Sequence, residues 1–134
     1  MFLLDAGVWA AVVDPRDRFH SSAKSIVLEL DHDLGALDLT LYEIANVVGI
    51  KMGLPDQARD MAQLVVDSCR DRLLALDVSL LHSACLCAGE NDLTAYDAAY
   101  VAAARRYGWT LVSADIADLV SKGLAVTPDA AVYP

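Results

Sequence analysis

Short apolar runs and longer segments of mixed polarity alternate along the chain. Four runs predict buried strands, at residues 2–4, 36–39, 73–76 and 109–112, with residues 124–126 as a fifth candidate. Between them, helical patterns cover residues 7–13, 19–31, 41–52, 55–72, 78–88, 94–107 and 116–122. Strands that alternate with helices predict an α/β fold, with a parallel central sheet of four to five strands flanked by helices.

Turn-forming residues mark the breaks between these elements. Residues 14–17 (Asp-Pro-Arg-Asp), 31–33 (Asp-His-Asp) and 89–92 (Gly-Glu-Asn-Asp) predict loops or solvated turns. Pro55 suits the first turn of a helix, and Gly108 is expected to end the helix over 94–107. Because the sequence has no repeat or linker, residues 1–134 predict a single domain.

The composition is strongly apolar, with 56% hydrophobic residues and a mean hydropathy of +0.38. No apolar stretch approaches the roughly 20 residues that a membrane-spanning helix needs. The first residues meet an acid at Asp5 without a basic segment before it, which argues against a secretory signal. Three cysteines, an odd number, favour reduced thiols and a cytoplasmic location. The apolar excess predicts surface buried against a partner.

The chain is also acidic, with a net charge of −9. Proteins that bind nucleic acid through simple electrostatics are usually basic, so this class is disfavoured. An enzyme that meets a polyanion through bound metal ions and a few local arginines remains compatible with the charge.

Four acids occupy comparable places in the pattern. Asp5, Glu43, Asp97 and Asp115 each lie where a predicted strand gives way to a helix, or one turn into that helix. In a parallel α/β sheet these junctions meet along one edge, where four carboxylates would repel one another unless a cation lay between them. Carboxylate oxygens bind Mg²⁺ and Mn²⁺. The pattern therefore predicts a divalent-metal site, and phosphodiester hydrolysis is a chemistry that such sites serve.

Helix capping is the alternative explanation for each acid taken alone. The spacings from Thr40 to Glu43 and from Thr94 to Asp97 both fit a capping box, and the other two acids could cap the helices that follow them. The two explanations are compatible, because a helix start also holds a carboxylate rigidly at the sheet edge. The occurrence of all four at separate junctions favours the metal site.

The same positions resemble a known family. Residues 2–9, 42–48, 93–102 and 111–115 resemble, in order and spacing, the PIN-domain ribonucleases, and in particular the small VapC-type toxins of prokaryotic toxin–antitoxin pairs. The most specific block is Thr-x-Tyr-Asp-Ala-x-Tyr at residues 94–100. The resemblance spans nearly the whole chain, and it implies a PIN-like fold.

The resemblance also implies a function and a set of site residues. The chain would be an endoribonuclease that depends on Mg²⁺ or Mn²⁺ and acts on RNA as the toxin of such a pair. It would form a homodimer, and a cognate antitoxin would inhibit it. The metal-binding catalytic acids would be Asp5, Glu43, Asp97 and Asp115, supported by Thr94, Asn46 and Ser113.

Two positions depart from the family pattern. Gly7 stands where the family usually has Ser or Asn, and Asp118 stands where it tends to have an apolar or aromatic residue. Asp118 is interpreted as an exposed acid of the first helical turn rather than as a further ligand. Arg16 and Arg18, in the loop after the first helix, are the basic residues expected nearest to a bound RNA backbone.

Other functions fit the sequence less well. A receiver-like signalling domain would have an acidic pair after its first strand and a lysine soon after a late strand. Here Asp5 is followed by Ala6 and Gly7, and the last junction has no lysine before Lys122. A phosphatase of the Asp-x-Asp type is disfavoured by Gly7. Two alternatives within the family stay open: a PIN fold without catalytic activity, and a housekeeping nuclease without an antitoxin.

The cysteines do not form a pattern typical of a zinc site. Cys69, Cys85, Cys87 and His82 are the candidate ligands, but Cys85 and Cys87 point to different sides of one helix, and the sequence has no Cys-x-x-Cys spacing. The cysteines are expected to be buried thiols. Structural roles are also expected for Trp9 and Tyr100 in the core, Asp77 as a helix cap, and Arg105 and Arg106 near the end of their helix.

Overall fold

A computed structural model describes residues 1–29 and 33–134. The predicted end of the second helix at Asp31, and the Asp31-His32 part of the predicted turn, lie outside the described residues. Within them, every predicted helix is found at least in part, and one more helix follows near the C-terminus.

The central sheet has four parallel strands in the order β3-β2-β1-β4. Their bounds are β1 (Phe2–Leu4), β2 (Leu34–Leu37), β3 (Leu73–Leu74) and β4 (Thr110–Val112). The α/β fold and the parallel sheet predicted from the sequence are thus confirmed. The fifth candidate strand is reduced to a single parallel bridge between Val126 and Val112.

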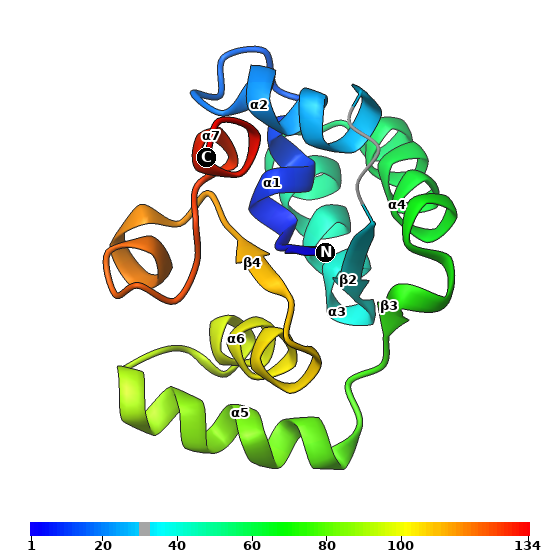
Figure 1. The fold of residues 1–134 in the computed structure, drawn as a ribbon. Helices are drawn as coiled ribbons and strands as arrows, with labels where there is room; N and C mark the ends of the chain where they lie inside the picture. Colours follow the sequence, from blue (N-terminus) through cyan, green and yellow to red (C-terminus); the bar gives the residue numbers. More distant parts are fainter. Residues whose placement is uncertain (30–32) are drawn as a thin grey trace.

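Helices cover both faces of the sheet (Figure 1). Single turns of π-helix extend or replace three of the helical segments, over Ser25–Glu29, Ala45–Lys51 and Ile116–Val120, and a 3₁₀ turn covers Arg70–Arg72. The α-helices are α1 (Ala6–Ala11), α2 (His20–Lys24), α3 (Asp38–Ile44), α4 (Pro55–Cys69), α5 (Val78–Asn91), α6 (Ala95–Tyr107) and α7 (Pro128–Val132).

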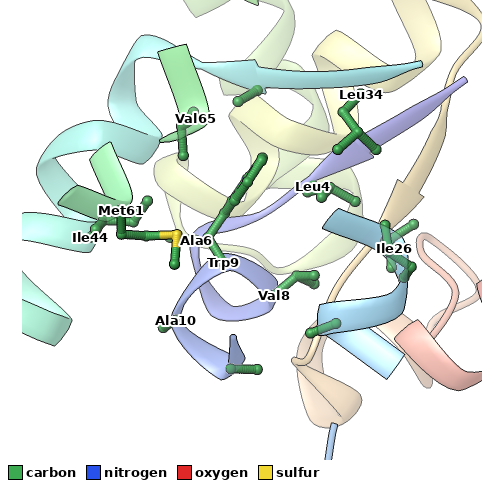
Figure 2. Close-up of a cluster of buried hydrophobic side chains, with 14 of the residues drawn as sticks. Leu4, Ala6, Val8, Trp9, Ala10, Ile26, Leu34, Ile44, Met61 and Val65 are labelled. Atoms are coloured by element: carbon green, nitrogen blue, oxygen red, sulfur yellow. The ribbon is translucent and has the colours of Figure 1, made fainter. Parts of the chain in front are cut away.

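Neighbouring residues of a strand point to opposite faces of the sheet, and this alternation builds two cores. Leu4 and Val112 face a core with α1, α3 and α4, in which the indole of Trp9 packs with residues such as Ile44 and Val65 (Figure 2). Leu3 and Leu111 face a second core with α5 and α6. Tyr100 belongs to this second core and Trp9 to the first, and both are buried as predicted.

The second strand begins and ends two residues earlier than the sequence pattern predicts. Leu34 and Gly35 pair with Phe2 and Leu3 of β1, and the chain turns into α3 at Asp38. A glycine occurs in this strand because the ring of Trp109 packs directly against the backbone of Gly35, which leaves no room for a side chain. A Cβ added at Gly35 would lie 2.4 Å from Cζ3 of Trp109.

Gly35→Ala is therefore expected to destabilise the protein by about 1–3 kcal/mol, because the new methyl group must displace a packed indole. Thermal or urea unfolding of the variant measures this effect. Gly89→Ala is the control, since nothing lies within 4 Å of a Cβ at that position. Because Gly89 lies in α5, this control is expected to be up to about 1 kcal/mol more stable than wild type. Equal stability of Gly35→Ala and wild type would show that Trp109 moves aside freely.

Two predictions about helices in the C-terminal half of the chain are wrong. Residues 89–91 continue α5 instead of forming a loop, and the helix ends at Asp92 in the left-handed conformation, at φ 52°. Helix α7 was not predicted; Thr127 caps it by accepting a hydrogen bond from the Ala130 N–H, and Pro128 is its first residue.

The thiols are only partly as expected. Cys69 and Cys87 are buried, but Cys85 is exposed. Helix α5 buries Leu80, Ala84 and Cys87 at helical spacing, so Cys85 lies on another side of it. Among the helices that the structure describes, none is long and apolar enough to cross a membrane.

Candidate active site

Two adjacent strands bring Asp5 and Ser113 together. Asp5 directly follows β1 and Ser113 directly follows β4, and the Asp5 N–H donates to the carbonyl oxygen of Val112 over 3.2 Å. The Ser113 hydroxyl donates to Oδ2 of Asp5, while the Val8 N–H donates to Oδ1 over 3.0 Å. Asp5 therefore caps α1 as predicted. Asp5 as a residue is only 8% exposed, and these contacts fix its carboxylate at the carboxyl edge of the sheet.

Asp115 is attached to the same serine. Its N–H donates to Oγ of Ser113 over 2.9 Å, so this one buried hydroxyl links the backbone of Asp115 to the carboxylate of Asp5. The Asp118 N–H donates to Oδ1 of Asp115 over 2.9 Å, which makes Asp115 the cap of the segment that follows. Asp118 is exposed and lies 3.7 Å from Nζ of Lys122. This placement is consistent with its interpretation as an exposed first-turn acid.

Asp97 lies in the first turn of α6, behind its cap. The hydroxyl of Thr94 donates to Oδ2 of Asp97 over 2.9 Å, and the Asp97 N–H donates to Oγ1 of Thr94 over 3.2 Å. The capping function predicted for Thr94 is confirmed. The same contacts hold the Asp97 carboxylate at the helix start.

Glu43 is placed differently from the prediction. Because α3 begins at Asp38, Glu43 lies in the second turn of the helix, and the capping box predicted for Thr40 and Glu43 is wrong. Thr40 instead accepts the Leu37 N–H over 3.2 Å. The carboxylate of Glu43 accepts a hydrogen bond from Tyr100, with 2.7 Å between Oη and Oε1. Helix α6 thus contributes both Asp97 and the partner of Glu43.

The electrostatics show that three of the acids are neighbours. Burial raises the pKa of Asp5 from 3.8 to about 6, the hydrogen bonds from Ser113 and Val8 oppose the rise, and the charges of Glu43 and Asp97 add to it. Burial also raises the pKa of Glu43, against the hydrogen bond from Tyr100, and Asp97 raises it further. Like charges raise a carboxyl pKa only when they lie close together. Asp5, Glu43 and Asp97 therefore share one edge of the molecule.

Asp97 also interacts electrostatically with the acids that follow β4. Burial raises its pKa, the hydrogen bond from Thr94 opposes the rise, and the charges of Asp115 and Asp118 add to it. Lys122 lowers the pKa of Asp97. Lys122 also donates from Nζ to the carbonyl oxygens of Asn91 (2.9 Å) and Asp92 (3.0 Å), which holds it near the loop that leads into α6.

The donor chemistry of this edge suits a hard divalent cation. Its side chains offer carboxylate and hydroxyl oxygens, which are the ligands of Mg²⁺ and Mn²⁺, and a cation would relieve the repulsion that raises their pKa values. Within residues 1–29 and 33–134, no three Asp, Glu, His or Cys side chains are arranged to hold an ion as they stand. The acids surround the edge without converging on one point.

The remaining predicted residues lie around this edge or beyond it. Asn46 is exposed and lines, with Glu43, a surface cavity of about 350 Å³ that also includes Tyr42 and Tyr96. Arg16 is exposed and pairs with Asp14 at 3.1 Å. Arg18 is exposed and lies over the ring of Phe19, 4.7 Å from its centroid.

Gly7 lies beside the carboxylate of Asp5. A Cβ at this position would be 3.3 Å from Oδ1 of Asp5 and 3.3 Å from Cβ of Ala114. The departure from the family pattern therefore falls directly next to an acid of the site.

Sequence reasoning missed Tyr100, Thr40 and Lys122 as residues of this site. Tyr100 was assigned to the core, which is correct for its ring but overlooks its hydroxyl. Its place in the block from Thr94 to Tyr100, one helical turn after Asp97, was the available signal. Nothing in the local sequence of Lys122 indicates that it reaches Asn91 and Asp92.

The parallel sheet and the acids at its carboxyl edge define the class of the protein: an α/β domain with an acidic site at the ends of its strands. A family model described as PIN domain matches residues 2–118, and the chain belongs to this family. The resemblance seen in the sequence is thus confirmed. A curated relative, Ribonuclease VapC3 of Pyrobaculum aerophilum, is 29% identical over 117 residues, which cover 84% of this chain and 88% of that protein.

Solved structures share the fold. A toxin–antitoxin complex from Klebsiella pneumoniae aligns with a TM-score of 0.72 and 16% identity, covering 96% of this chain and 98% of that one. VapC20 of Mycobacterium tuberculosis, described as a Sarcin-Ricin loop cleaving toxin, aligns with a TM-score of 0.64 and 18% identity, covering 84% of this chain and 87% of that one.

Proposed function

We propose that the chain is an endoribonuclease that depends on Mg²⁺ or Mn²⁺ and acts as the toxin of a toxin–antitoxin pair. The observation that carries this proposal is the gathering of partly or fully buried carboxylates at the carboxyl edge of the sheet, where Ser113 holds Asp5 and Tyr100 holds Glu43. Burial raises the pKa of both carboxyls, and the nearby charge of Asp97 adds to the rise at each. Such charges are costly to gather unless a cation uses them. The ribonuclease name of the curated relative supports the reaction.

The residues of the site would have separate roles. Asp5, Glu43, Asp97 and Asp115 would hold the ion, which when bound would activate water and neutralise charge that develops on the phosphate. Ser113 fixes Asp5, and Thr94 fixes Asp97. Asn46 lines the cavity beside Glu43, where an RNA strand would lie. Arg16 and Arg18, although outside the acidic edge, would contact the RNA backbone.

The proposed partners fit an apolar surface next to the site. A cavity of about 220 Å³ is lined by the apolar side chains of Leu39, Leu76, Val78, Leu81 and Tyr96, together with Asp77 and three alanines. Leu39 and Tyr96 also line the cavity that holds Glu43. Exposed apolar patches mark protein interaction sites. The patch supports a cognate antitoxin and a second copy of the chain as partners, and a related complex is a toxin–antitoxin pair.

The test is cleavage of structured RNA by the purified protein, with the ends of the products mapped. We expect cleavage with added Mg²⁺ or Mn²⁺ and none in excess chelator, with recovery when the ion is restored. Cleavage that persists in chelator would falsify the metal dependence. An absence of cleavage under all ionic conditions would favour the alternative of an inactive PIN scaffold.

A further inference from the structure

A chain of three hydrogen bonds runs from the end of β2 to Glu43. The Leu37 N–H donates to Oγ1 of Thr40 over 3.2 Å, Oγ1 of Thr40 lies 2.7 Å from Oη of Tyr100, and Tyr100 donates to Oε1 of Glu43 over 2.7 Å. Thr40 is 0% exposed and Tyr100 is 2% exposed. The chain is therefore shielded from water until it reaches Glu43.

The direction of every bond in this chain is determined. A phenol has one hydrogen to donate, and an ionised carboxylate can only accept, so the hydrogen of Tyr100 points to Glu43. The bond between Thr40 and Tyr100 must then be donated by Thr40. The Thr40 hydroxyl thus donates to Tyr100 and at the same time accepts from the Leu37 N–H, which fixes the position of its oxygen. The backbone at the end of β2 thus orients the phenol of Tyr100.

Packing alone does not require this hydroxyl. The ring of Tyr100 fills the core against α5, a role that phenylalanine would serve equally. Burying a hydroxyl is unfavourable unless it is hydrogen-bonded, and here both partners lie on α3, across the fold from α6. The hydroxyl therefore serves the contact with Glu43.

The side chain of Glu43 needs a contact that fixes its rotamer. It is half-buried, it lines an open cavity, and a glutamate that is not fixed would sample several rotamers. Tyr100 occupies Oε1, and within residues 1–29 and 33–134 no hydrogen-bond donor contacts Oε2. The carboxylate is thus held by one oxygen and free at the other.

We propose that Tyr100, oriented by Thr40, is a positioning residue that holds Oε1 of Glu43 and so presents Oε2 to the divalent ion. The inference rests on the proposed function, because it assumes that Glu43 is a metal ligand. It goes further by assigning a role to two buried side chains that lie behind that ligand.

The test is the affinity of the metal-free protein for Mn²⁺, followed by electron paramagnetic resonance at constant pH. Tyr100→Phe is expected to bind Mn²⁺ about 10–100-fold more weakly than wild type, the range typical for loss of a group that orients a metal ligand. Tyr107→Phe is the matched control, because Tyr107 is on the same helix and packs on Trp109, with 5.1 Å between ring centroids. It should bind as wild type does.

The Mn²⁺ affinity of Glu43→Gln, alone and combined with Tyr100→Phe, distinguishes failure of this inference from failure of the proposed function. If Glu43→Gln leaves Mn²⁺ affinity unchanged, Glu43 is not a ligand, and that part of the proposed function fails together with the inference. If Glu43→Gln weakens binding but Tyr100→Phe does not, the inference alone is wrong. We expect both to weaken it, and Tyr100→Phe to have little further effect when added to Glu43→Gln.

A third pair decides the question if Tyr100→Phe does not fold. Thr40→Ser keeps the hydroxyl and should retain Mn²⁺ affinity, whereas Thr40→Val removes it and should weaken binding. A purely structural role predicts lower melting temperatures for Tyr100→Phe and Thr40→Val, with unchanged Mn²⁺ affinity of the folded protein. That result would overturn the inference.

Discussion

Replacing Asp97 with Asn is expected to slow RNA cleavage by about a thousandfold. A catalytic metal ion contributes several kcal/mol to stabilisation of the transition state, and each 1.36 kcal/mol corresponds to a factor of ten in rate. Among the acids, Asp97 is the one whose charge interacts with both ends of the site, raising the pKa of Asp5 and Glu43 while its own pKa is raised by Asp115. Its loss should therefore disturb metal binding more than the loss of a peripheral acid. The measurement is the single-turnover cleavage rate at a fixed Mg²⁺ concentration no higher than wild type needs for full activity.

The same variant should remain folded. Removing one of several repelling charges does not destabilise the fold, and Thr94 can still cap α6 through the Asp97 N–H. Circular dichroism and the melting temperature check this point. Asp60→Asn is the control, because Asp60 is a 78% exposed carboxylate of α4. Retention of more than about a tenth of the wild-type rate by a folded Asp97→Asn protein would remove Asp97 from the catalytic residues.

The metal-free protein is expected to become more stable as the pH falls from 7 to 5. Asp5 has a pKa of about 6 in the folded chain, against 3.8 as its ordinary value, chiefly because it is buried. Between these values the folded state binds more protons than the unfolded state, so stability increases as the pH decreases. A shift of this size corresponds to about 3 kcal/mol in full and about 1 kcal/mol between pH 7 and 5. Glu43 and Asp97, whose pKa values are also raised, act in the same direction.

Asp5→Asn should remove much of this pH dependence and stabilise the metal-free protein at pH 7 by about 1–3 kcal/mol. Urea unfolding at pH 5 and pH 7, in chelator, measures both effects. A helix cap without charge repulsion predicts no gain from Asp5→Asn at either pH, because Asn caps a helix about as well as Asp does, and a loss of about 1 kcal/mol from Asp5→Ala. The second test is added Mg²⁺, which should raise the melting temperature of wild type more than that of the variant. A variant less stable than wild type at pH 7 would contradict the proposed cluster.

The sequence predicted the parts of the site that depend on local pattern. Asp5 follows an apolar run that ends in β1, and its capping contact with Val8 needs only a strand, a turn and a helix in that order. Thr94 and Asp97 lie at the start of α6, where a hydroxyl and an acid three residues apart form a cap in isolation. These features depend on a few neighbouring residues, and the structure has them where the pattern placed them.

The parts that depend on tertiary packing could not be predicted. The sequence pattern placed the second strand two residues too late, because it does not show that Trp109, far along the chain, packs against Gly35. That misassignment moved the start of α3 and gave Glu43 the wrong place in its helix. The role of the Tyr100 hydroxyl could not be predicted for the same reason. Tyr100 and Glu43 are far apart in the sequence, and only the folded chain brings the hydroxyl to the carboxylate.

The strand order has a consequence for when the proposed site can form. The first strand made, β1, has the last strand, β4, as one of its two neighbours, and Ser113 reaches Asp5 only after that pairing. Residues 1–92 form most of the first core but lack Asp97, Ser113 and Asp115 altogether. The proposed nuclease site is therefore incomplete while the growing polypeptide is still short. Any nuclease activity arises late, after synthesis has passed β4.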